Sequence, residues 1–307
     1  MAKISVLMAT YKERKEHLSL AIESILKQTY RDFEFIIILD NPDNFEHIEL
    51  IKEYQRHDER IKFYINENNM GLPKTLNKGI KIASGQYLCR MDADDMSESY
   101  RLEKQLNYLC SNGYDLIGGL STMIDEDGNT IYNIKSVPTD YKKIKKALKY
   151  NQVISHPTWF GKIEVFKSLN GYRMIPLCED YDFTLRAVLK GYIVSNLNTN
   201  VLNYRMTKNS ISRSNLYEQY LYMRYITNQY AKGQVAEISL AEKYVNQHTN
   251  HVKSEAYLRS NKYFNEMLHK LELKQYLYFC ILGIKILFSS NDYLNKIYRL
   301  LRVSMYS

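Results

Sequence analysis

The sequence predicts an α/β protein whose sheet is mostly parallel. Across the first hundred residues, short apolar runs alternate with segments in which apolar residues recur at helical spacing. The runs are apolar at successive positions, which is typical of strands that are buried on both faces. Polar or acidic residues directly follow several runs. With 307 residues, of which 45% are hydrophobic and 25% charged, the chain can form one large folded domain or two small ones.

The individual elements follow from this pattern. We expect strands at residues 4–9, 33–39, 61–65 and 86–91. Between them we expect helices with apolar stripes at residues 18–26, 48–51 and 72–83. In parallel sheets, ligands bind beyond the carboxyl ends of the strands. The residues that follow the expected strands should therefore share one edge: Thr10, Tyr11, Asp40 and residues 92–95.

Three carboxylates follow the fourth expected strand, in the segment Arg90-Met91-Asp92-Ala93-Asp94-Asp95. Like charges this close raise one another's pKa, and a divalent cation with oxygen ligands relieves the repulsion. A metal-bound phosphate is the natural ligand of such a group. Alternatively, Asp94, Asp95 or Ser97 caps a helix expected over residues 98–109.

Cysteine usage and charge narrow the setting. The four cysteines have neither Cys-x-x-Cys spacing nor His partners, which argues against zinc and against a disulfide framework. The first apolar run is too short for a secretory signal, so we expect a cytoplasmic protein. The net charge of +8 suggests an anionic partner: nucleic acid, a nucleotide or an acidic membrane surface. The lysine-rich segment 142–149 fits an amphipathic helix whose lysines face solvent.

A series of short motifs resembles the nucleotide-binding half of family 2 glycosyltransferases in order and spacing. These motifs are residues 6–11, 28–30, 38–40, 69–72, 77–80, 83–85 and 90–95. Later segments resemble the acceptor side of bacterial enzymes that build capsules, O-antigens and teichoic-acid decorations. These are residues 155–157, 171–172 and 179–182.

The resemblance implies a GT-A fold, which is Rossmann-like, with a helical C-terminal extension. It implies an inverting enzyme that uses Mn²⁺ or Mg²⁺ and moves a hexose or N-acetylhexosamine from a UDP-sugar to a saccharide acceptor, here expected to be lipid-linked. No nucleic acid partner is expected. Residues 1–214 would form the catalytic domain, with the nucleotide-sugar part at 1–98 and the acceptor side at 99–214. Residues 215–307 would be helical.

The resemblance also assigns donor-side roles. Asp94 would bind the metal with help from Asp92, Asp40 would accept a hydrogen bond from the uracil imide, and Tyr11 would lie against the base. Family members often carry two consecutive aspartates where this chain has Leu39-Asp40, and Asp40 also suits the start of a turn. Lys74 is either a phosphate or base contact or a solvated lysine at a helix start. The remaining donor contacts would be Ala9, Thr10, Glu13, Asn69, Asn77, Arg90 and Ala93.

On the acceptor side, a carboxylate must take the proton of the attacking hydroxyl. We predict Asp180 as this base, Glu179 as its orienting or acceptor-binding neighbour, and Asp182 as a capping residue in the same helix start. Acids at a helix start are also favoured for electrostatic reasons alone.

Sugar contacts are predicted beside an expected strand over residues 158–160. By resemblance, His156, Trp159 and Asp95 would contact the donor sugar or the acceptor, although a lone histidine is more often structural. Many relatives carry a histidine at the position of Met206, so Arg205 remains the candidate phosphate contact there.

From residue 215 onward, long helical stripes rich in Tyr, Leu and Ile carry no motif of the family. Residues 275–288 form the most apolar segment, which Lys285 interrupts and which is shorter than a membrane span. We expect a basic amphipathic helical pair that rests on the inner face of the cytoplasmic membrane, or else packs on the catalytic core or at a homodimer interface.

Two other classes of function remain open. A sugar-nucleotide nucleotidyltransferase would need a Gly-rich basic loop after the first strand, and residues 9–14 contain no glycine. A non-catalytic carbohydrate- or partner-binding module would have no need for Asp92, Asp94 and Asp180 together.

Overall fold

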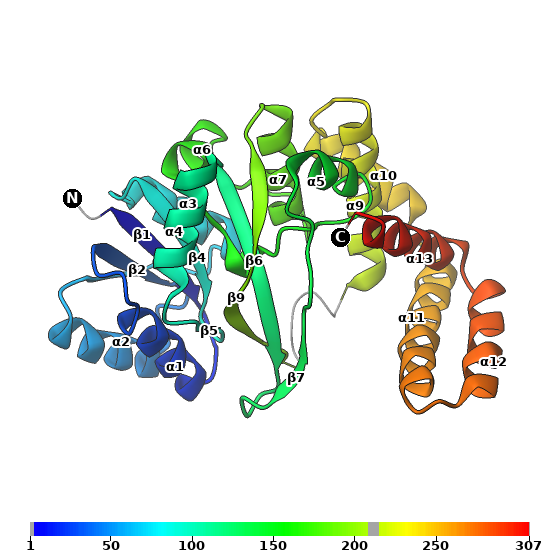
Figure 1. The fold of residues 1–307 in the computed structure, drawn as a ribbon, viewed down its shortest axis with the longest axis horizontal. Coiled ribbons are helices and arrows are strands. Elements are labelled where there is room, and N and C mark those ends of the chain that lie inside the picture. Colours follow the sequence, from blue (N-terminus) through cyan, green and yellow to red (C-terminus); the bar gives the residue numbers. More distant parts are fainter. Residues whose placement is uncertain (1–2, 208–214, 307) are drawn as a thin grey trace.

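A computed structural model describes residues 3–207 and 215–306, which form one sheet with helices on both faces and a helical region beside it (Figure 1). The first four strands are β1 (Ile4–Thr10), β2 (Phe33–Leu39), β3 (Ile61–Ile65) and β4 (Tyr87–Asp92). They are parallel, in the order β3-β2-β1-β4. All four expected strands are confirmed.

The apolar runs serve two cores because neighbouring residues of a strand point to opposite faces. In β1, Val6 and Met8 join one cluster of buried side chains, whereas Leu7 joins the other. Helices α1 (Lys15–Leu26), α2 (Phe45–His57) and α4 (Arg101–Asn112) cover the first face, and α3 (Leu72–Ile82), α6 (Ile163–Ser168) and α7 (Glu179–Leu189) cover the second. The fold is therefore layered as the sequence pattern predicted.

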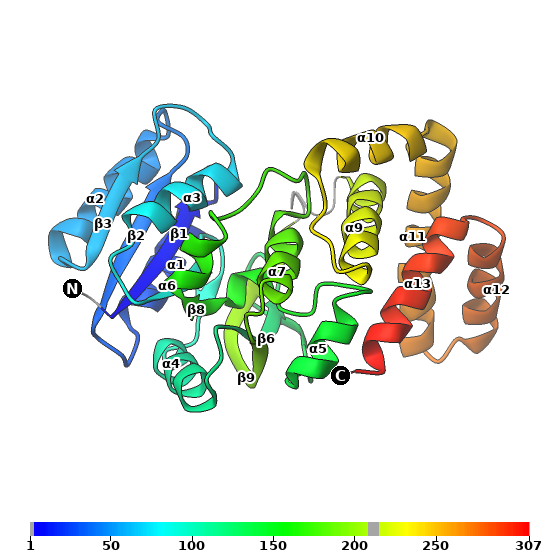
Figure 2. The same ribbon diagram turned by 90° about the horizontal axis from the view of Figure 1, so that it is seen from above.

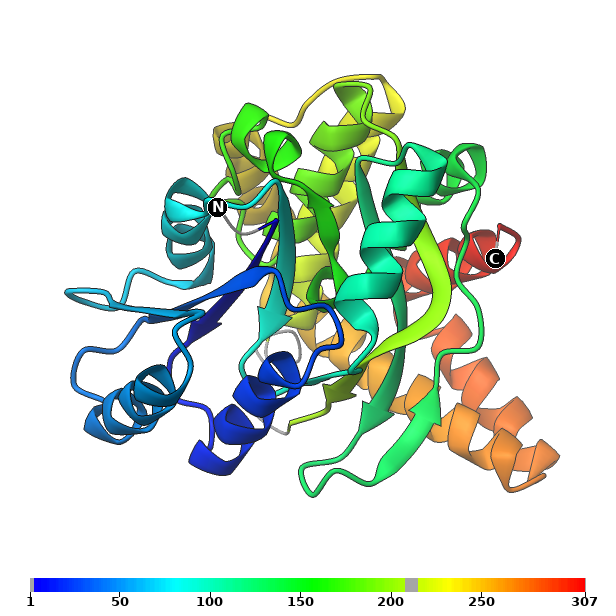
Figure 3. The same ribbon diagram turned by 60° about the vertical axis from the view of Figure 1, so that its left-hand side comes forward.

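The second half of the chain extends the same sheet (Figure 3). Strand β8 (Phe160–Lys162) pairs antiparallel with β4 and with β6 (Leu116–Ile124), and β6 runs parallel to β9 (Val194–Arg205). Two short strands complete it: β5 (Met96–Ser97) beside β9, and β7 (Thr130–Asn133) beside β6. The two halves of the chain up to Arg205 thus share one continuous sheet.

Three local expectations on this side can be compared with the structure. The strand expected over residues 158–160 begins only at Phe160, because His156–Thr158 form a 3-10 turn around Pro157, which has no N–H for a ladder. Helix α4 follows Tyr100, so neither Asp94, Asp95 nor Ser97 caps it. In α5 (Tyr141–Ala147), Ile144 and Ala147 are buried while the lysines face solvent, as predicted.

The C-terminal helices are α9 (Leu216–Ala231), α10 (Ile238–His248), α11 (His251–Glu272), α12 (Tyr276–Leu287) and α13 (Asn291–Ser304). Much of the chain's tyrosine joins them, since the rings of Tyr217, Tyr220, Tyr257 and Tyr293 pack in a chain with centroids 5.1–6.3 Å apart. Helices α11 and α12 form a hairpin on the side away from the nucleotide half (Figures 1 and 2). None of the helices in the described ranges combines the length and apolar character needed to cross a membrane. The predicted boundary at residue 214 lies outside the described residues.

Candidate active site

The ends of three strands meet at one edge of the sheet, as predicted. Ala9 is opposite both Ile38 and Asp92 in the strand register, and the Asp40 N–H donates to the Thr10 carbonyl at 2.8 Å. Thr10, Asp40 and Asp92 are thereby brought together by backbone pairing alone. The loops that follow them supply the polar groups of the candidate site.

Glu13 organises the loop that follows β1. One carboxylate oxygen accepts hydrogen bonds from the Thr10 hydroxyl at 2.7 Å and from the Tyr11 N–H at 2.8 Å. The buried His47 of α2 contacts both the Thr10 hydroxyl and the Glu13 carbonyl, at 3.2 and 2.9 Å. Tyr11 keeps its ring 36% exposed at the edge of the site. These hydrogen bonds fix the loop that carries Tyr11. The contacts with the nucleotide base that are predicted for Thr10 and Tyr11 stay predictions.

Asp40 fixes the turn that leads into α3. Its Oδ1 accepts from the Asn66 amide at 2.7 Å and from the Met70 N–H at 2.9 Å, and its Oδ2 accepts from the Gly71 N–H at 2.8 Å. A carboxylate has about four acceptor positions, so Oδ2 retains one. Asp40 is therefore a turn residue, as the alternative stated, and the uracil contact is compatible with this role.

The other predicted donor residues near α3 differ in their surroundings. Asn69 accepts from the Gly71 N–H at 3.0 Å, and Lys74 is solvent-exposed at the start of α3. Asn77 instead pairs with the backbone of Tyr172, donating at 2.8 Å and accepting at 2.7 Å. Gly171 has φ +69°, and a Cβ there would collide with the Asn77 amide. Asn77 thus ties α3 to the segment that carries Tyr172.

The carboxylates that follow β4 raise one another's pKa. The buried Arg90 forms an ion pair with Asp92. Burial, the Asp92 charge and the Glu13 charge raise the pKa of Asp94 to about 7. A divalent cation would offset this repulsion, and the donors are hard carboxylate oxygens that suit Mn²⁺ or Mg²⁺. No trio of His, Cys, Asp or Glu in the described part of the chain is arranged to hold a metal ion.

Asp95 is the first correction among the predicted sugar contacts. Its side chain is fully buried, and its Oδ1 accepts from the Arg205 N–H at 2.8 Å, so it offers no exposed surface to a sugar. The Arg205 guanidinium donates to the carbonyls of Asp94, Asp125 and Glu126 at 2.9–3.0 Å. Arg205 therefore holds the Asp94-Asp95 loop in place, and the phosphate contact proposed for it stays a prediction.

Glu179 and Asp180 open α7, as predicted. The Tyr181 N–H donates to Asp180 Oδ1 at 2.7 Å, which fixes the carboxylate at the helix start. Burial raises the pKa of Asp180. Burial and the Asp180 charge raise the pKa of Glu179 to about 7. Two partly desolvated acids therefore sit side by side, as a general base and its neighbour would.

Asp182 is not the capping residue that we predicted. It is buried and accepts hydrogen bonds from Arg173 Nε at 3.0 Å and from Arg186 Nε at 2.8 Å. The guanidinium of Arg186 also donates to the carbonyls of Leu169 and Gly171 at 2.8 Å. Asp182 thus locks α7 to the segment that carries Tyr172.

Replacing Asp182 with Asn should reduce the free energy of unfolding by about 3–5 kcal/mol, because two guanidinium groups lose their buried counter-charge. Urea denaturation of the purified protein measures the change. The control is Glu23→Gln, which removes the exposed ion pair with Lys27 and should cost no more than about 1 kcal/mol. A loss at Asp182 as small as that of the control would contradict the structural role.

Arg90 links the two acid groups. Its charge acts on the pKa values of Glu179 and Asp180, although it is ion-paired with Asp92. The pKa of the buried Tyr172 is raised mainly by burial, and Asp180, Glu179 and Asp92 all add to the rise. Acids from both halves of the chain thus affect the pKa of one hydroxyl group. The carboxylates after β4 and those at the start of α7 are therefore within electrostatic reach of the same two side chains, Arg90 and Tyr172.

His156 lies next to Tyr172. Its Nε2 lies 2.8 Å from the Tyr172 hydroxyl. Burial, and then the Arg90 charge, hold the pKa of His156 well below its usual value, so the imidazole is neutral. Its predicted sugar contact stays a prediction, and the structure gives it a structural partner as well.

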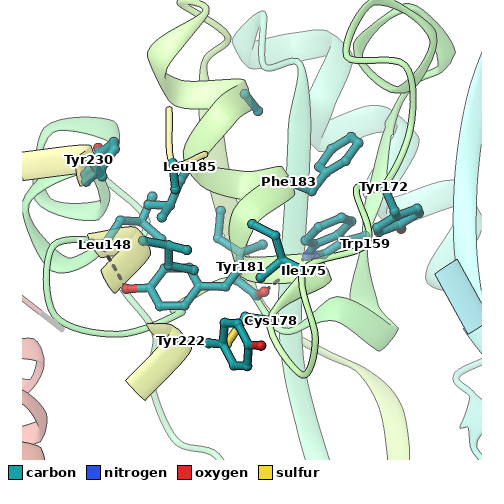
Figure 4. Close-up of a cluster of buried hydrophobic side chains, with 14 of the residues drawn as sticks. Leu148, Trp159, Tyr172, Ile175, Cys178, Tyr181, Phe183, Leu185, Tyr222 and Tyr230 are labelled. Atoms are coloured by element: carbon teal, nitrogen blue, oxygen red, sulfur yellow. Dashed lines mark hydrogen bonds between the residues drawn. The ribbon is translucent and has the colours of Figure 1, made fainter. Parts of the chain in front are cut away.

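Trp159 is the second correction. The ring is fully buried, and its N–H donates to the Ile154 carbonyl at 3.1 Å, so it offers no face to a sugar. It packs against His156, with ring centroids 4.6 Å apart, and stacks on Tyr172 at 6.2 Å. Figure 4 shows Trp159 inside an aromatic cluster with Tyr172 and Phe183. Trp159 therefore holds His156 and Tyr172 in place by packing against them.

The sequence did not single out Arg101, which is fully buried in α4. Its Nη2 donates to the Arg90 carbonyl at 2.8 Å and to the Pro157 carbonyl at 3.0 Å. It thereby joins the end of β4 to the turn that carries His156. An arginine among the charges of an amphipathic helix resembles a surface residue, so no pattern in the sequence marks this role.

The pH dependence of catalysis should reveal Glu179. Its pKa of about 7 means that it carries a proton below pH 7 and a charge above it. In the role predicted for Asp180, the second negative charge would make it a stronger base, so kcat/KM should rise several-fold as the pH passes upward through about 7. The Glu179→Gln enzyme should lack this step, and an unchanged pH–rate profile would contradict the coupling.

Comparison with known proteins agrees with this geometry. The model of the family described as "Glycosyl transferase family 2" matches residues 5–169, more than half of the chain. The O-antigen biosynthesis glycosyltransferase WbnJ of Escherichia coli is 36% identical over 213 residues, which cover 69% of this chain and 82% of that protein.

A second Escherichia coli relative, UDP-Gal:alpha-D-GlcNAc-diphosphoundecaprenol beta-1,3-galactosyltransferase, is 32% identical over 216 residues, which cover 69% of this chain and 77% of that protein. Among solved structures, S. aureus TarS 1-349 in complex with UDP-GlcNAc matches with a TM-score of 0.61 at 18% identity, covering 99% of this chain and 89% of that one. This likeness confirms the predicted fold class. The chain belongs to glycosyltransferase family 2.

Proposed function

We propose that this glycosyltransferase moves a hexose or N-acetylhexosamine from a UDP-sugar to a lipid-linked saccharide in surface polysaccharide biosynthesis, with inversion at the anomeric carbon. The observation that carries the proposal is Arg90, which forms an ion pair with Asp92 and whose charge acts on the pKa values of Glu179 and Asp180. The names of the two bacterial relatives support the substrate classes, since one contains O-antigen biosynthesis and the other a UDP-sugar with a diphosphate-linked acceptor. The catalytic domain is proposed to span residues 1–214.

The donor's diphosphate is proposed to lie at Asp92 and Asp94. These residues would hold a Mn²⁺ or Mg²⁺ ion, which neutralises the charge that develops on the departing diphosphate. Arg90 pairs with Asp92, and the loop that Glu13 organises would present Tyr11 to the nucleotide base. Asp40 Oδ2 would accept the uracil imide N–H with its remaining acceptor position.

Asp180 is proposed as the general base. It takes the proton of the acceptor hydroxyl while the oxygen attacks the anomeric carbon from the face opposite the diphosphate. The new carbon–oxygen bond forms as the bond between sugar and phosphate breaks, and UDP leaves. Burial raises the pKa of Asp180, which brings the carboxylate closer to the pH at which a base is effective.

The test is calorimetry against UDP-, GDP-, dTDP- and CMP-sugars, each with and without Mn²⁺, followed by an assay for release of the nucleoside diphosphate. We expect binding that requires the metal and favours UDP-sugars, together with slow hydrolysis of the matching donor. Preference for another base would refute the role of Asp40. Binding without any cleavage would favour a non-catalytic module.

The tip of the α11–α12 hairpin, residues 270–278, is proposed to rest on an anionic membrane. Leu273, Tyr276 and Leu277 are 52%, 60% and 72% exposed, and Lys270 and Lys274 lie among them. Apolar side chains flanked by lysines suit an interface with acidic lipids. Such contact would bring the catalytic domain to a lipid-linked acceptor.

Sedimentation with vesicles that contain phosphatidylglycerol tests this contact. The wild type should bind, and the double variant Leu273→Glu/Leu277→Glu should lose most of its binding. Val252→Glu is a matched control, because Val252 is 75% exposed at the opposite end of α11. Equal binding by all three proteins would contradict the proposal, and a concentration-dependent dimer lost only in the double variant would assign the tip to a homodimer.

A further inference from the structure

A cavity of about 210 Å³ lies between the start of α7 and the helices α9 and α13. Its lining includes Asp180 of α7, Lys296 and Arg299 of α13, Tyr220 of α9 and Tyr257 of α11. The charge of Arg90, which pairs with Asp92, acts on the pKa of the same Asp180. The predicted base therefore lines a cavity that the C-terminal helices help to build.

The two cations of the cavity have no carboxylate partner in the described residues. Arg299 is buried and donates to the Tyr150 carbonyl at 2.8 Å, the Lys149 carbonyl at 3.2 Å and the Thr227 hydroxyl at 2.8 Å. These partners are all neutral. An arginine that is desolvated without a counter-charge is unusual, because buried charges are normally paired.

Lys296 is half-buried, and its contacts are also with neutral groups. Its ammonium donates to the Asn261 amide oxygen at 3.3 Å and lies 5.0 and 5.6 Å from the ring centres of Tyr293 and Tyr257. Aromatic faces and an amide stabilise a cation only partly. Burial lowers the pKa of Lys296, and no acidic neighbour counters the effect. An anion in the cavity would complete the environment of both side chains.

The size and lining of the cavity limit which ligands can bind in it. Complete pockets for drug-sized ligands start at about 300 Å³. A cavity of about 210 Å³ therefore accepts one polar group of a larger molecule, such as a sugar ring or a phosphate. The adjoining Asp180 would receive the acceptor hydroxyl, so the anion belongs to the acceptor rather than to the donor.

We propose that this cavity is the acceptor's anion subsite, in which Lys296 and Arg299 bind a phosphate attached to the acceptor sugar. The inference rests on the proposed function, because it takes Asp180 to be the base. It assigns to the C-terminal helices a part in acceptor recognition, in addition to packing against α7. Lys296 is the residue to test, since Arg299 also supports the backbone of residues 149–150.

The experiment compares three acceptors: N-acetylglucosamine linked through a diphosphate to a decyl chain, the uncharged decyl glycoside, and N-acetylglucosamine 1-phosphate. The wild type should prefer the first over the second roughly ten- to hundredfold through a lower KM, as expected for a charge-assisted contact. The third acceptor separates the sources of the phosphate, because it keeps the charge and lacks the lipid.

In the Lys296→Gln enzyme this preference should largely disappear, while donor hydrolysis and UDP affinity stay unchanged. Lys296→Arg should retain the preference because the charge remains. Lys243→Gln, which removes a solvent-exposed lysine on α10, is the matched control and should behave as the wild type. An equal loss on charged and uncharged acceptors, or no loss, would overturn the subsite.

Calorimetric titration of the three probes separates this inference from the proposed function. If the wild type cleaves none of the nucleotide sugars, the proposed function fails. The subsite still stands if the diphosphate-linked probe binds more tightly than the decyl glycoside and Lys296→Gln removes the difference. If charge makes no difference to binding in the wild type, the subsite is refuted even in an active enzyme.

Discussion

Replacing Asp180 with Asn should lower the rate of sugar transfer by about 10²–10⁴-fold, the usual contribution of a positioned general base. The asparagine keeps the shape of the side chain and can still accept from the Tyr181 N–H, so the start of α7 should remain intact. It cannot take a proton from the acceptor. The affinity for the UDP-sugar should be unchanged, because the role proposed for Asp180 is in activating the acceptor.

Steady-state kinetics and calorimetry on one preparation separate these effects. Asp127→Asn is the control, since Asp127 is exposed in the turn before β7 and distant in sequence from both acid pairs. Its transfer rate should match that of the wild type. Retained transfer by the Asp180→Asn enzyme would remove Asp180 from the role of base.

The second large effect is expected at Asp94. Replacing it with Ala should weaken UDP binding in the presence of Mn²⁺ by about 100-fold or more, because even residues that only support metal ligands contribute 10–100-fold to metal affinity. Without metal, the variant and the wild type should bind UDP with similar affinity. The variant should also be more stable than the wild type in metal-free buffer above pH 7, where the wild type must keep a buried carboxylate of raised pKa ionised.

Titrations of UDP with and without Mn²⁺ test this expectation, and thermal unfolding at pH 6 and pH 8 tests the stability. The control is Asp43→Asn, which alters an exposed aspartate in the turn after Asp40. Equal metal-dependent affinity in the wild type and the Asp94→Ala protein would contradict the role of Asp94 as a metal ligand.

The strands could be predicted closely from the sequence because their physical signal is local. Strands β2 and β3 have the predicted bounds, since unbroken apolar runs between turn residues leave little freedom for the ends. The edge that gathers Thr10, Asp40 and Asp92 also followed, because parallel pairing fixes where strands end. The strand near Trp159 was placed too early, since Pro157 favours a turn there.

The errors at the site have a common physical cause. Asp95, Trp159 and Asp182 are assigned by residue type and position, and all three are buried against other segments of the chain. Asp182 pairs with Arg173, and Asp95 accepts from the Arg205 backbone. Which residues meet across elements depends on tertiary packing, which periodicity does not encode.

The cavity beside Asp180 was unforeseen for the same reason. Lys296 and Arg299 were assigned to a basic helical pair that would meet a membrane, a partner subunit or the catalytic core. The structure places Arg299 against residues 149–150 of the catalytic core and keeps both side chains at the cavity. A helical pattern predicts that one face is buried, but not against which surface.

The central claim is that Asp94 and Asp180 act on one substrate from opposite sides. A crystal structure of the protein with UDP-GlcNAc and Mn²⁺ tests it most directly. The account predicts electron density for the metal between the Asp94 carboxylate and the diphosphate, with the Asp180 carboxylate on the opposite face of the sugar. Metal bound away from Asp94, or a sugar whose open face points away from Asp180, would contradict it.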